Sequence, residues 1–563
     1  MTDLLSGAEW VQGVVLTCLL VVCVLRTTRL LTASIHALQQ DDYSNVRFWG
    51  WYKASGARTL FSRTLVVLFA AAVAEAILSL TSNRWLSYPI PALVAVCAIV
   101  ADLARKRAPR KKPLVYTGRA NRLLAASLVL VAFTFTFFLW LATIAVSPRT
   151  GLVDLGEGFV TGFGILCGAS FALLLVPLAA MLANFLLWPY QAFINWTFRF
   201  RAGRKMRRFH PMVVGITGSY GKTSTKYFTE ALMESRYRVL KTRASFNTIL
   251  GICRAVNEEL GPEHQAFIVE MGAYRRGEVR DMARLTRPHI GVLTAIGPQH
   301  LERFGSIETV ERAKFELLEA LKPDGIAVIN NDDPIVRRLA DGLSGPAIRR
   351  YGIDRTADEL DLAAESIEHG PDGLTFTLID REGKRVTVKT RLIGLHNVSN
   401  ILAAASVARA ADVSMREIAG AIGRLQPVPH RLEVHTGADG VTIIDDAYNS
   451  NPVGAAGALA ALAEFKTGRK ILVTPGMVEL GTEQDARNQE FGAAAAKVCD
   501  YIILVGRNQT AAIRRGIFAT DFAADRAISV KNLTDGLEAM RGIVRSGDIV
   551  LFENDLPDLY DEE

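Results

Sequence analysis

The sequence predicts a multi-domain chain in which an N-terminal α-helical bundle precedes two α/β domains. Three observations favour this fold class. The chain has 563 residues, more than one hydrophobic core holds together, so it should divide into several domains. Half of its residues are hydrophobic, and the long apolar stretches lie before about Pro189. Beyond that point, short apolar runs alternate with helical patterns, as in α/β domains.

Five apolar stretches near the N-terminus are long enough, or nearly so, to cross a bilayer as helices. A hydrocarbon core of about 30 Å requires roughly 20 apolar residues in helical form. The stretches span residues 10–26, 62–81, 87–103, 121–147 and 160–189. Almost no ionisable residue interrupts them, Glu75 being the main exception, which favours an anchor in the lipid bilayer over an ion path.

Basic segments after the first, third and fifth stretches indicate the orientation. Lysine and arginine concentrate on the cytoplasmic side of membranes, so these segments should share that side. The net charge of +7 then reflects membrane orientation, and no nucleic acid is expected as a partner. We expect a multi-pass protein of the inner (plasma) membrane, with residues 1–208 as the membrane region and everything after Pro211 in the cytoplasm. The basic residues that carry this expectation are Arg26, Arg29, Arg47, Lys53, Arg58, Arg63, Arg105, Lys106, Arg107, Arg110, Lys111, Lys112, Arg119, Arg122, Arg199, Arg201, Arg204, Lys205, Arg207 and Arg208.

A strand, a glycine loop and a helix follow the last basic segment. The apolar run from Met212 to Thr217 is typical of a buried parallel strand, and the next seven residues are Gly218, Ser219, Tyr220, Gly221, Lys222, Thr223 and Ser224. Such a loop cradles phosphates with backbone N–H groups, Lys222 reaches the terminal phosphates, and Thr223 binds Mg²⁺. The loop is shorter than the usual P-loop, because Ile216 stands where glycine is expected. We therefore predict an α/β P-loop ATPase domain over 209–425.

The shortened loop TGSYGKTS resembles that of the Mur ligases, and further motifs match in family order. They are TRASFNTILG at 242–251, VEMGA at 269–273, GPQHLERFGS at 297–306, AKFELLEAL at 313–321, GLHNVSN at 394–400, PHRLEV at 429–434, IDDAYNSNP at 444–452 and GMVELG at 476–481. The resemblance implies an ATP-dependent amide-bond ligase that acts through an acyl phosphate. The DDAYNSNP and HNVSN forms are most similar to the type that adds D-alanyl-D-alanine to a UDP-muramoyl tripeptide in peptidoglycan precursor synthesis.

Three polar residues are candidates for the metal and catalytic chemistry. Glu270 ends the apolar run that starts at Ala266, where the edge of a parallel strand faces a nucleotide, so it is a Mg²⁺ candidate or a solvated strand-end carboxylate. By resemblance, His300 ligates a second Mg²⁺. Lys314 corresponds to a lysine that several family members carbamylate into a metal ligand; without the resemblance it reads as a surface lysine. With Thr223, these residues form the expected metal set, and Lys222, His300 and Lys314 the catalytic set.

Four further residues are expected at the nucleotide by resemblance. Asn397 and Asn400 resemble the family's contacts on the adenine side, with helix N-capping as the alternative. Arg431 and Asp445 match residues that reach ATP from the C-terminal domain, and Asp445 is alternatively a turn residue at the end of a strand. Contacts from two domains imply that the ATP site is completed by domain closure.

The last part of the chain, 426–563, reads as a smaller Rossmann-like α/β domain. Its expected strands lie near 441–445, 471–474, 501–505 and 548–552. The family admits the incoming amine near Gly476, but here Pro475 replaces the usual acidic residue. The ending from Phe552 to Asp558 also departs from the muramoyl-tripeptide type.

The substrates stay open at this point. Membrane spans and a basic linker stand where the family carries a UDP-binding domain, so the carboxylate acceptor is either a UDP-muramoyl peptide or a lipid- or polymer-linked acid. The amine is an amino acid or a dipeptide. Three hypotheses follow: ligation of a cell-wall precursor, the same chemistry on another acceptor such as a poly-glutamate-type polymer, or an inactive ATP-binding membrane scaffold.

Overall fold

The computed structural model describes two compact units, Met1–Ile194 and Asn195–Glu563, which we name the N-terminal and C-terminal units. The boundary falls within helix α10 (Trp188–Phe209), and the domain limits given above remain predictions. The described residues are 2–40, 42–53, 63–79, 89–104, 114–145, 157–243, 246–353, 360–448 and 450–555. Most of the second basic segment, from Arg105 to Lys112, lies outside them, as does Arg58.

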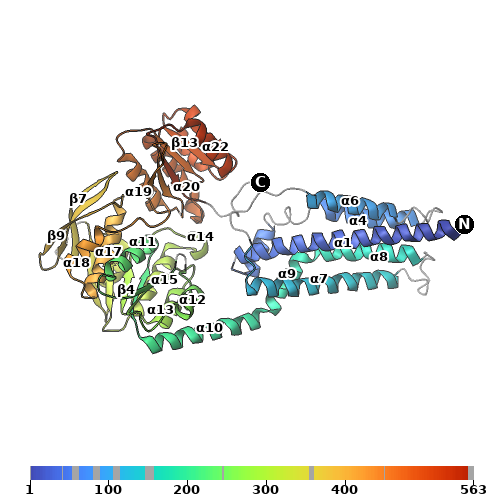
Figure 1. The fold of residues 1–563 in the computed structure, drawn as a ribbon, viewed down its shortest axis with the longest axis horizontal. Coiled ribbons are helices and arrows are strands. Elements are labelled where there is room, and N and C mark those ends of the chain that lie inside the picture. The colour runs from blue at the N-terminus through green and yellow to red at the C-terminus, as the bar shows by residue number, and fades with distance from the viewer. Residues whose placement is uncertain are drawn as a thin grey trace. The chain divides into compact units, whose positions relative to one another are not determined.

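In its described part the N-terminal unit contains helices joined by short turns and no strands, and the described residues of the first four predicted apolar stretches lie on helices. Helix α7 packs against α8, α4 against α8, and α1 against α6 (Figure 1). The buried seam between them consists of small and branched apolar residues such as Leu31, Ala72 and Ile99. The helices are α1 (Thr2–Gln40), α2 (Asn45–Trp51), α4 (Arg63–Ser79), α6 (Pro89–Ala104), α7 (Gly118–Ala145), α8 (Glu157–Leu174) and α9 (Val176–Leu186).

Two of these helices are long and apolar enough to cross a membrane, over Gly13–Gln40 and Gly118–Leu141. The stretch 160–189, expected as one span, is instead split into α8 and α9, which are bent by 59°. Pro177 explains the break, because proline in the first turn of α9 cannot continue the hydrogen bonding of α8. Helices α4 and α6 are shorter than a bilayer span in their described parts.

The first α/β domain of the C-terminal unit is built on a nine-stranded sheet of order β2-β3-β1-β4-β5-β6-β7-β8-β9. Strands β1 to β7 pair in parallel, and β7, β8 and β9 form an antiparallel extension. This antiparallel extension was not predicted from the sequence. The strands are β1 (Met212–Thr217), β2 (Val239–Lys241), β3 (Ala266–Glu270), β4 (Ile290–Leu293), β5 (Ile326–Asn330), β6 (Ala347–Gly352), β7 (Leu362–Gly370), β8 (Gly373–Asp380) and β9 (Arg385–Thr390).

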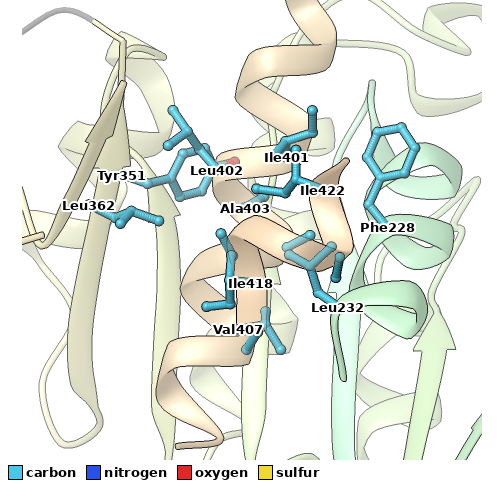
Figure 2. Packing of buried hydrophobic residues seen from close by; sticks show 14 of the residues in the cluster. Phe228, Leu232, Tyr351, Leu362, Ile401, Leu402, Ala403, Val407, Ile418 and Ile422 are labelled. Carbon is cyan, nitrogen blue, oxygen red and sulfur yellow. The ribbon is translucent and has the colours of Figure 1, made fainter. Parts of the chain in front are cut away.

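Helices cover both faces of this sheet, which explains why its central strands β1, β3 and β4 are almost entirely apolar and buried. Helices α11, α17 and α18 bury one face, where Phe228 and Leu232 meet Leu402 and Ile422 (Figure 2). Helices α12, α13, α15 and α16 bury the opposite face. Their bounds are α11 (Lys222–Met233), α12 (Ile249–Glu258), α13 (Glu278–Thr286), α14 (Leu301–Phe304), α15 (Ile307–Glu319), α16 (Pro334–Asp341), α17 (His396–Ala410) and α18 (Met415–Ile422).

The second α/β domain contains a six-stranded sheet of order β10-β11-β15-β12-β13-β14. Its four predicted strands are confirmed as β11 (Thr442–Asp446), β12 (Lys470–Thr474), β13 (Tyr501–Val505) and β15 (Ile549–Glu553). Two edge strands, β10 (Glu433–Thr436) and β14 (Ala527–Val530), were not foreseen. The helices are α19 (Pro452–Ala463), α20 (Gln484–Val498), α21 (Ala511–Phe518) and α22 (Leu533–Ile543).

Candidate active site

The glycine loop between β1 and α11 passes too close to its neighbours for any other residue. Gly218 has φ +149°, and a Cβ there would lie 2.0 Å from Oγ1 of Thr294. Gly221 has φ +77°, and a Cβ there would lie 2.4 Å from Oδ1 of Asn400. These positions therefore require glycine, both for the backbone conformation and for the space. The loop is held between the end of β4 and the first turns of α17.

Lys222 folds back over this loop. Its Nζ donates to the carbonyl oxygens of Gly218 at 2.7 Å and Ser219 at 2.9 Å. Burial lowers the pKa of Lys222 to about 8, and the nearby charge of Arg431 acts in the same direction, whereas Glu270 raises it. The lysine is thus a half-buried cation at a phosphate-type loop.

Ser219 and Tyr220 fix the loop to the segment after β4. The Ser219 hydroxyl donates to the Gly297 carbonyl at 3.0 Å and accepts from the Gly297 N–H at 3.1 Å. The Tyr220 ring packs against the same glycine, since a Cβ at Gly297 would lie 2.6 Å from its hydroxyl. Burial raises the pKa of Tyr220, and its hydroxyl has no hydrogen-bond partner in the described part of the chain.

Glu270 ends β3 and lies beside the first turn of α11. The Thr223 hydroxyl donates to its two carboxylate oxygens at 3.2 and 3.1 Å. The Lys226 ammonium lies 2.9 Å from Oε2, and both side chains of this ion pair are buried. Lys226 was not predicted as a site residue, although it lies one helical turn after Lys222 and therefore on the same face of α11. Glu270 is not a solvated strand-end carboxylate, because only 2% of the residue is exposed.

His300 and Lys314 are both brought towards the loop. His300 precedes α14 with φ +54°, its Nδ1 contacts the Glu479 carboxylate, and its ring lies 4.8 Å from that of Tyr274. Burial lowers the pKa of His300, which the contact with Glu479 opposes. Glu479 was not among the predicted site residues, although it belongs to the quoted GMVELG motif.

Lys314 is a buried lysine of α15, not a surface residue, with 2% of it exposed. Its ammonium lies 5.7 Å from the centre of the Phe304 ring, and no described side chain accepts a hydrogen bond from it. Burial lowers the pKa of Lys314 well below its ordinary value, and the charge of Lys222 lowers it further. Lys222, Glu270, His300 and Lys314 thus form one electrostatically connected group.

Asn397 and Asn400 lie on the first turn of α17 and are both buried. Neither caps the helix: the N-cap residue is Leu395, and Asn397 Nδ2 instead donates to the Ile393 carbonyl at 2.8 Å. Asn400 Nδ2 donates to Asn397 Oδ1 at 3.2 Å, which leaves Asn400 Oδ1 against Gly221. This pair of asparagines therefore supports the glycine loop directly.

Arg431 and Asp445 come from the second α/β domain. The Arg431 guanidinium lies 4.7 Å from the centre of the Tyr448 ring and close enough to Lys222 to lower its pKa. Asp445 Oδ2 contacts His430 Nδ1 at 2.7 Å, and its Oδ1 accepts from the Ala447 N–H at 3.1 Å. Arg431 therefore reaches the loop, whereas Asp445 is engaged with the turns around its own strand.

A buried carboxyl pair, Asp446 and Glu553, also lies on the second sheet and was not predicted. The two are register partners on β11 and β15. Burial raises the pKa of Asp446 to about 6, and burial and Asp446 together raise that of Glu553 well above its ordinary value. The Ser450 hydroxyl donates to Glu553 at 2.5 Å, and Asn554 Nδ2 donates to the Gly476 carbonyl at 2.6 Å. These hydrogen bonds link the segments that follow β11, β12 and β15.

The described residues include no group of three or more His, Cys, Asp or Glu side chains arranged to hold a metal ion. The expected metal set, however, also contains the hydroxyl of Thr223 and the side chain of Lys314, which are not among these four residue types. Thr223 and Glu270 are in contact, and His300 and Lys314 lie within electrostatic range of each other.

Comparison with known proteins identifies the two α/β domains. Residues 216–408 match the Mur ligase middle domain, and residues 430–553 match the Mur ligase, glutamate ligase domain. The UDP-N-acetylmuramoyl-tripeptide–D-alanyl-D-alanine ligase of Mycobacterium tuberculosis is 33% identical over 368 residues, covering 60% of this chain and 69% of its own. The Bacillus subtilis enzyme of the same name is 30% identical over 344 residues, covering 61% and 72%.

Solved structures of MurF share the fold of these two domains. MurF from Thermotoga maritima in complex with ADP superposes with a TM-score of 0.56 at 25% identity, covering 64% of this chain and 80% of that one. MurF from Acinetobacter baumannii gives a TM-score of 0.58 at 24% identity, covering 64% and 77%, which shows the shared fold. With the phosphate-type loop and its surrounding lysines, these likenesses show that the chain belongs to the Mur ligase family of ATP-dependent amide-bond-forming enzymes.

Proposed function

We propose that this protein is a membrane-anchored Mur ligase that joins a D-alanyl-D-alanine-type dipeptide to the terminal carboxylate of a UDP-muramoyl tripeptide. One observation carries the proposal: the buried Glu270 and Lys314 and the half-buried Lys222 and His300 form one charged group at a glycine loop, in a chain about a third identical to ligases with that specificity. The product belongs to peptidoglycan precursor synthesis.

The residues of the site can be assigned roles in ATP binding and in transfer of the phosphoryl group. The glycine loop binds the phosphates of ATP through its backbone N–H groups, and Lys222 and Arg431 offset negative charge at the transferring phosphoryl group. A carboxylate oxygen of the acceptor attacks the γ-phosphorus, giving an acyl phosphate and ADP. The neutral amine then adds to the acyl carbon, and the tetrahedral intermediate collapses to amide and phosphate. Asn397, Asn400 and Asp445 remain proposed nucleotide contacts.

Mg²⁺ fits two places in this group. The Thr223 hydroxyl and the Glu270 carboxylate supply the oxygen ligands that Mg²⁺ prefers, and they already touch. His300 with a carbamylated Lys314 would hold a second ion. The metal would neutralise charge where two sets of anions meet.

The burial of Lys314 supports its proposed carbamylation. A neutral amine, and not an ammonium, reacts with CO₂, forming a carbamate and releasing one proton. The lowered pKa of Lys314 leaves the amine neutral at lower pH than in an exposed lysine. The resulting carboxylate-like group would also balance the positive charge of Lys222.

The N-terminal unit would anchor the enzyme at the cytoplasmic face of the plasma membrane. The support is the two apolar helices and the bent pair α8–α9, together with the basic segments after the first, third and fifth apolar stretches. We retain five spans with the N-terminus outside as the proposed topology.

A second candidate function is the same chemistry on a lipid- or polymer-linked acceptor. Two features favour it: Pro475 where the family carries an acidic residue, and the atypical C-terminal segment from Phe552 to Asp558.

Phosphate release from ATP separates these candidates. The full-length protein in detergent is supplied with Mg²⁺, UDP-muramoyl tripeptide and D-alanyl-D-alanine, and each is replaced in turn. Release that requires both supports the proposal, and release only with another acceptor or amine supports the second candidate. No release with any combination would identify an inactive scaffold.

A further inference from the structure

A small recess in the N-terminal unit is lined by two arginines and neutral side chains. Its lining residues are Arg119, Arg122 and Leu123 of α7, with Asn184, Leu187, Tyr190 and Gln191 from α9, α10 and their junction. We name this group the arginine recess. It belongs to a different unit from the nucleotide site, so the ligase chemistry does not account for it.

Both guanidinium groups are held in place by aromatic rings and amide oxygens. Arg119 lies 3.9 Å from the centre of the Tyr43 ring and donates to Asn184 Oδ1 at 3.4 Å. Arg122 lies 5.3 Å from the Tyr190 ring and donates to Gln191 Oε1 at 3.0 Å. Asn184 is fixed in turn, because its Nδ2 donates to the Tyr43 carbonyl at 2.8 Å. The recess is therefore organised before any ligand arrives.

Among the residues that the structure describes, no carboxylate pairs with either positive charge. Neither arginine forms an ion pair with any described carboxylate, and the nearest acidic influence, Asp42, is itself paired with Arg47 at 3.2 Å. Each guanidinium has five N–H donors, and among the described residues one acceptor per arginine is found, Asn184 for Arg119 and Gln191 for Arg122. The recess thus offers unused donors and uncompensated charge.

We propose that the arginine recess binds the phosphate headgroup of a membrane lipid that carries two negative charges, namely a phosphomonoester or a pyrophosphate. Two adjacent guanidiniums match a dianionic group better than a singly charged phosphodiester, and their planar forks fit phosphate oxygens. The N-terminus of α7, which starts at Gly118, adds a favourable dipole. The proposal rests on the proposed membrane location.

Exposed aromatic and apolar residues beside the recess favour a lipid over a soluble phosphate. Phe185, Trp188 and Phe193 are 67%, 65% and 61% exposed, and Tyr190 of the lining is 53% exposed. Such aromatic residues are enriched where a protein meets the headgroup layer. Basic pockets between membrane helices on the cytoplasmic side are suited to anionic headgroups.

Calorimetric titration of the full-length protein in neutral detergent tests the assignment. Short-chain phosphatidic acid, a phosphomonoester, should bind about tenfold more tightly than phosphatidylglycerol, a phosphodiester. The double variant Arg119→Gln/Arg122→Gln should weaken binding of phosphatidic acid at least about tenfold. The matched control Arg201→Gln/Arg204→Gln removes two exposed arginines of α10 and should leave binding unchanged.

Several outcomes would overturn the proposal. These are equal affinity of the wild-type protein for the two lipids, equal losses in the two double variants, and inorganic pyrophosphate binding as tightly as phosphatidic acid. The comparison of lipids on the wild-type protein does not depend on any variant folding. Membrane fractionation of the same chain tests the anchoring separately, since a soluble chain contradicts the proposed location and a membrane-bound chain without lipid preference contradicts only the recess.

Discussion

Lys222 links the glycine loop to the other charged residues of the site. It closes the glycine loop through two carbonyl oxygens, and its charge acts on both His300 and Lys314. The identity of this lysine and of the glycines beside it was predictable from the sequence, because a P-loop requires those residue types at fixed spacing. The Glu479 partner of His300 was not, because 179 residues separate the two and only the folded chain joins them.

Replacing Lys222 with alanine should reduce amide formation at least about a thousand-fold, because the variant lacks the cation opposite the transferring phosphoryl group. The measurement is ADP release under saturating substrates. An Arg201→Ala variant, which removes an exposed cation distant from the loop, serves as the control. Near-normal turnover by Lys222→Ala would show that the loop has been assigned wrongly.

Lys314 should carry a carbamate that is detectable without any assay of activity. Protein equilibrated with ¹³C-bicarbonate should show one carbamate carbon resonance, and this resonance should be missing in Lys314→Gln. The signal should grow as the pH rises through the lowered pKa of Lys314 and fade as the pH falls below it, because only the neutral amine reacts. A resonance that persists in the variant would assign the carbamate elsewhere.

At the scale of elements, the order of strands and helices around the site was largely predictable. Runs such as Ala266–Val269 are continuous and apolar because both faces of the sheet are covered, and polar residues at their ends mark the functional edge. The edge strand β14 and the extension β7–β9 were not predictable in this way, because half-exposed strands carry no such run. The break between α8 and α9 was signalled only by Pro177.

The ion pair between Lys226 and Glu270 joins helix α11 to strand β3. The variant Lys226→Met should lower the free energy of unfolding by about 3–5 kcal/mol, because the buried Glu270 carboxylate loses its counter-charge. Chemical denaturation measures this change. Adding Glu270→Gln to the variant should recover part of the loss, and a double variant that is less stable by the full sum of both single effects would contradict the pairing.

At the scale of the whole molecule, the proposal joins a membrane region to a cytoplasmic ligase. Sequence likeness covers the two α/β domains and stops short of the N-terminal unit, so the membrane topology depends on hydropathy and on the distribution of basic residues. A topology reporter fused after Arg208 should give a cytoplasmic signal, because basic segments remain on the cytoplasmic side of the membrane. A periplasmic signal would contradict the five-span topology.

The central claim is that ATP activates a carboxylate by forming an acyl phosphate, and the fate of a carboxylate oxygen tests it most directly. The full-length enzyme is given UDP-muramoyl tripeptide with an ¹⁸O-labelled terminal carboxylate, together with ATP, Mg²⁺ and D-alanyl-D-alanine. The account predicts that each released phosphate carries one oxygen from the carboxylate, detected by mass spectrometry. Amide formation that releases only unlabelled phosphate would contradict it.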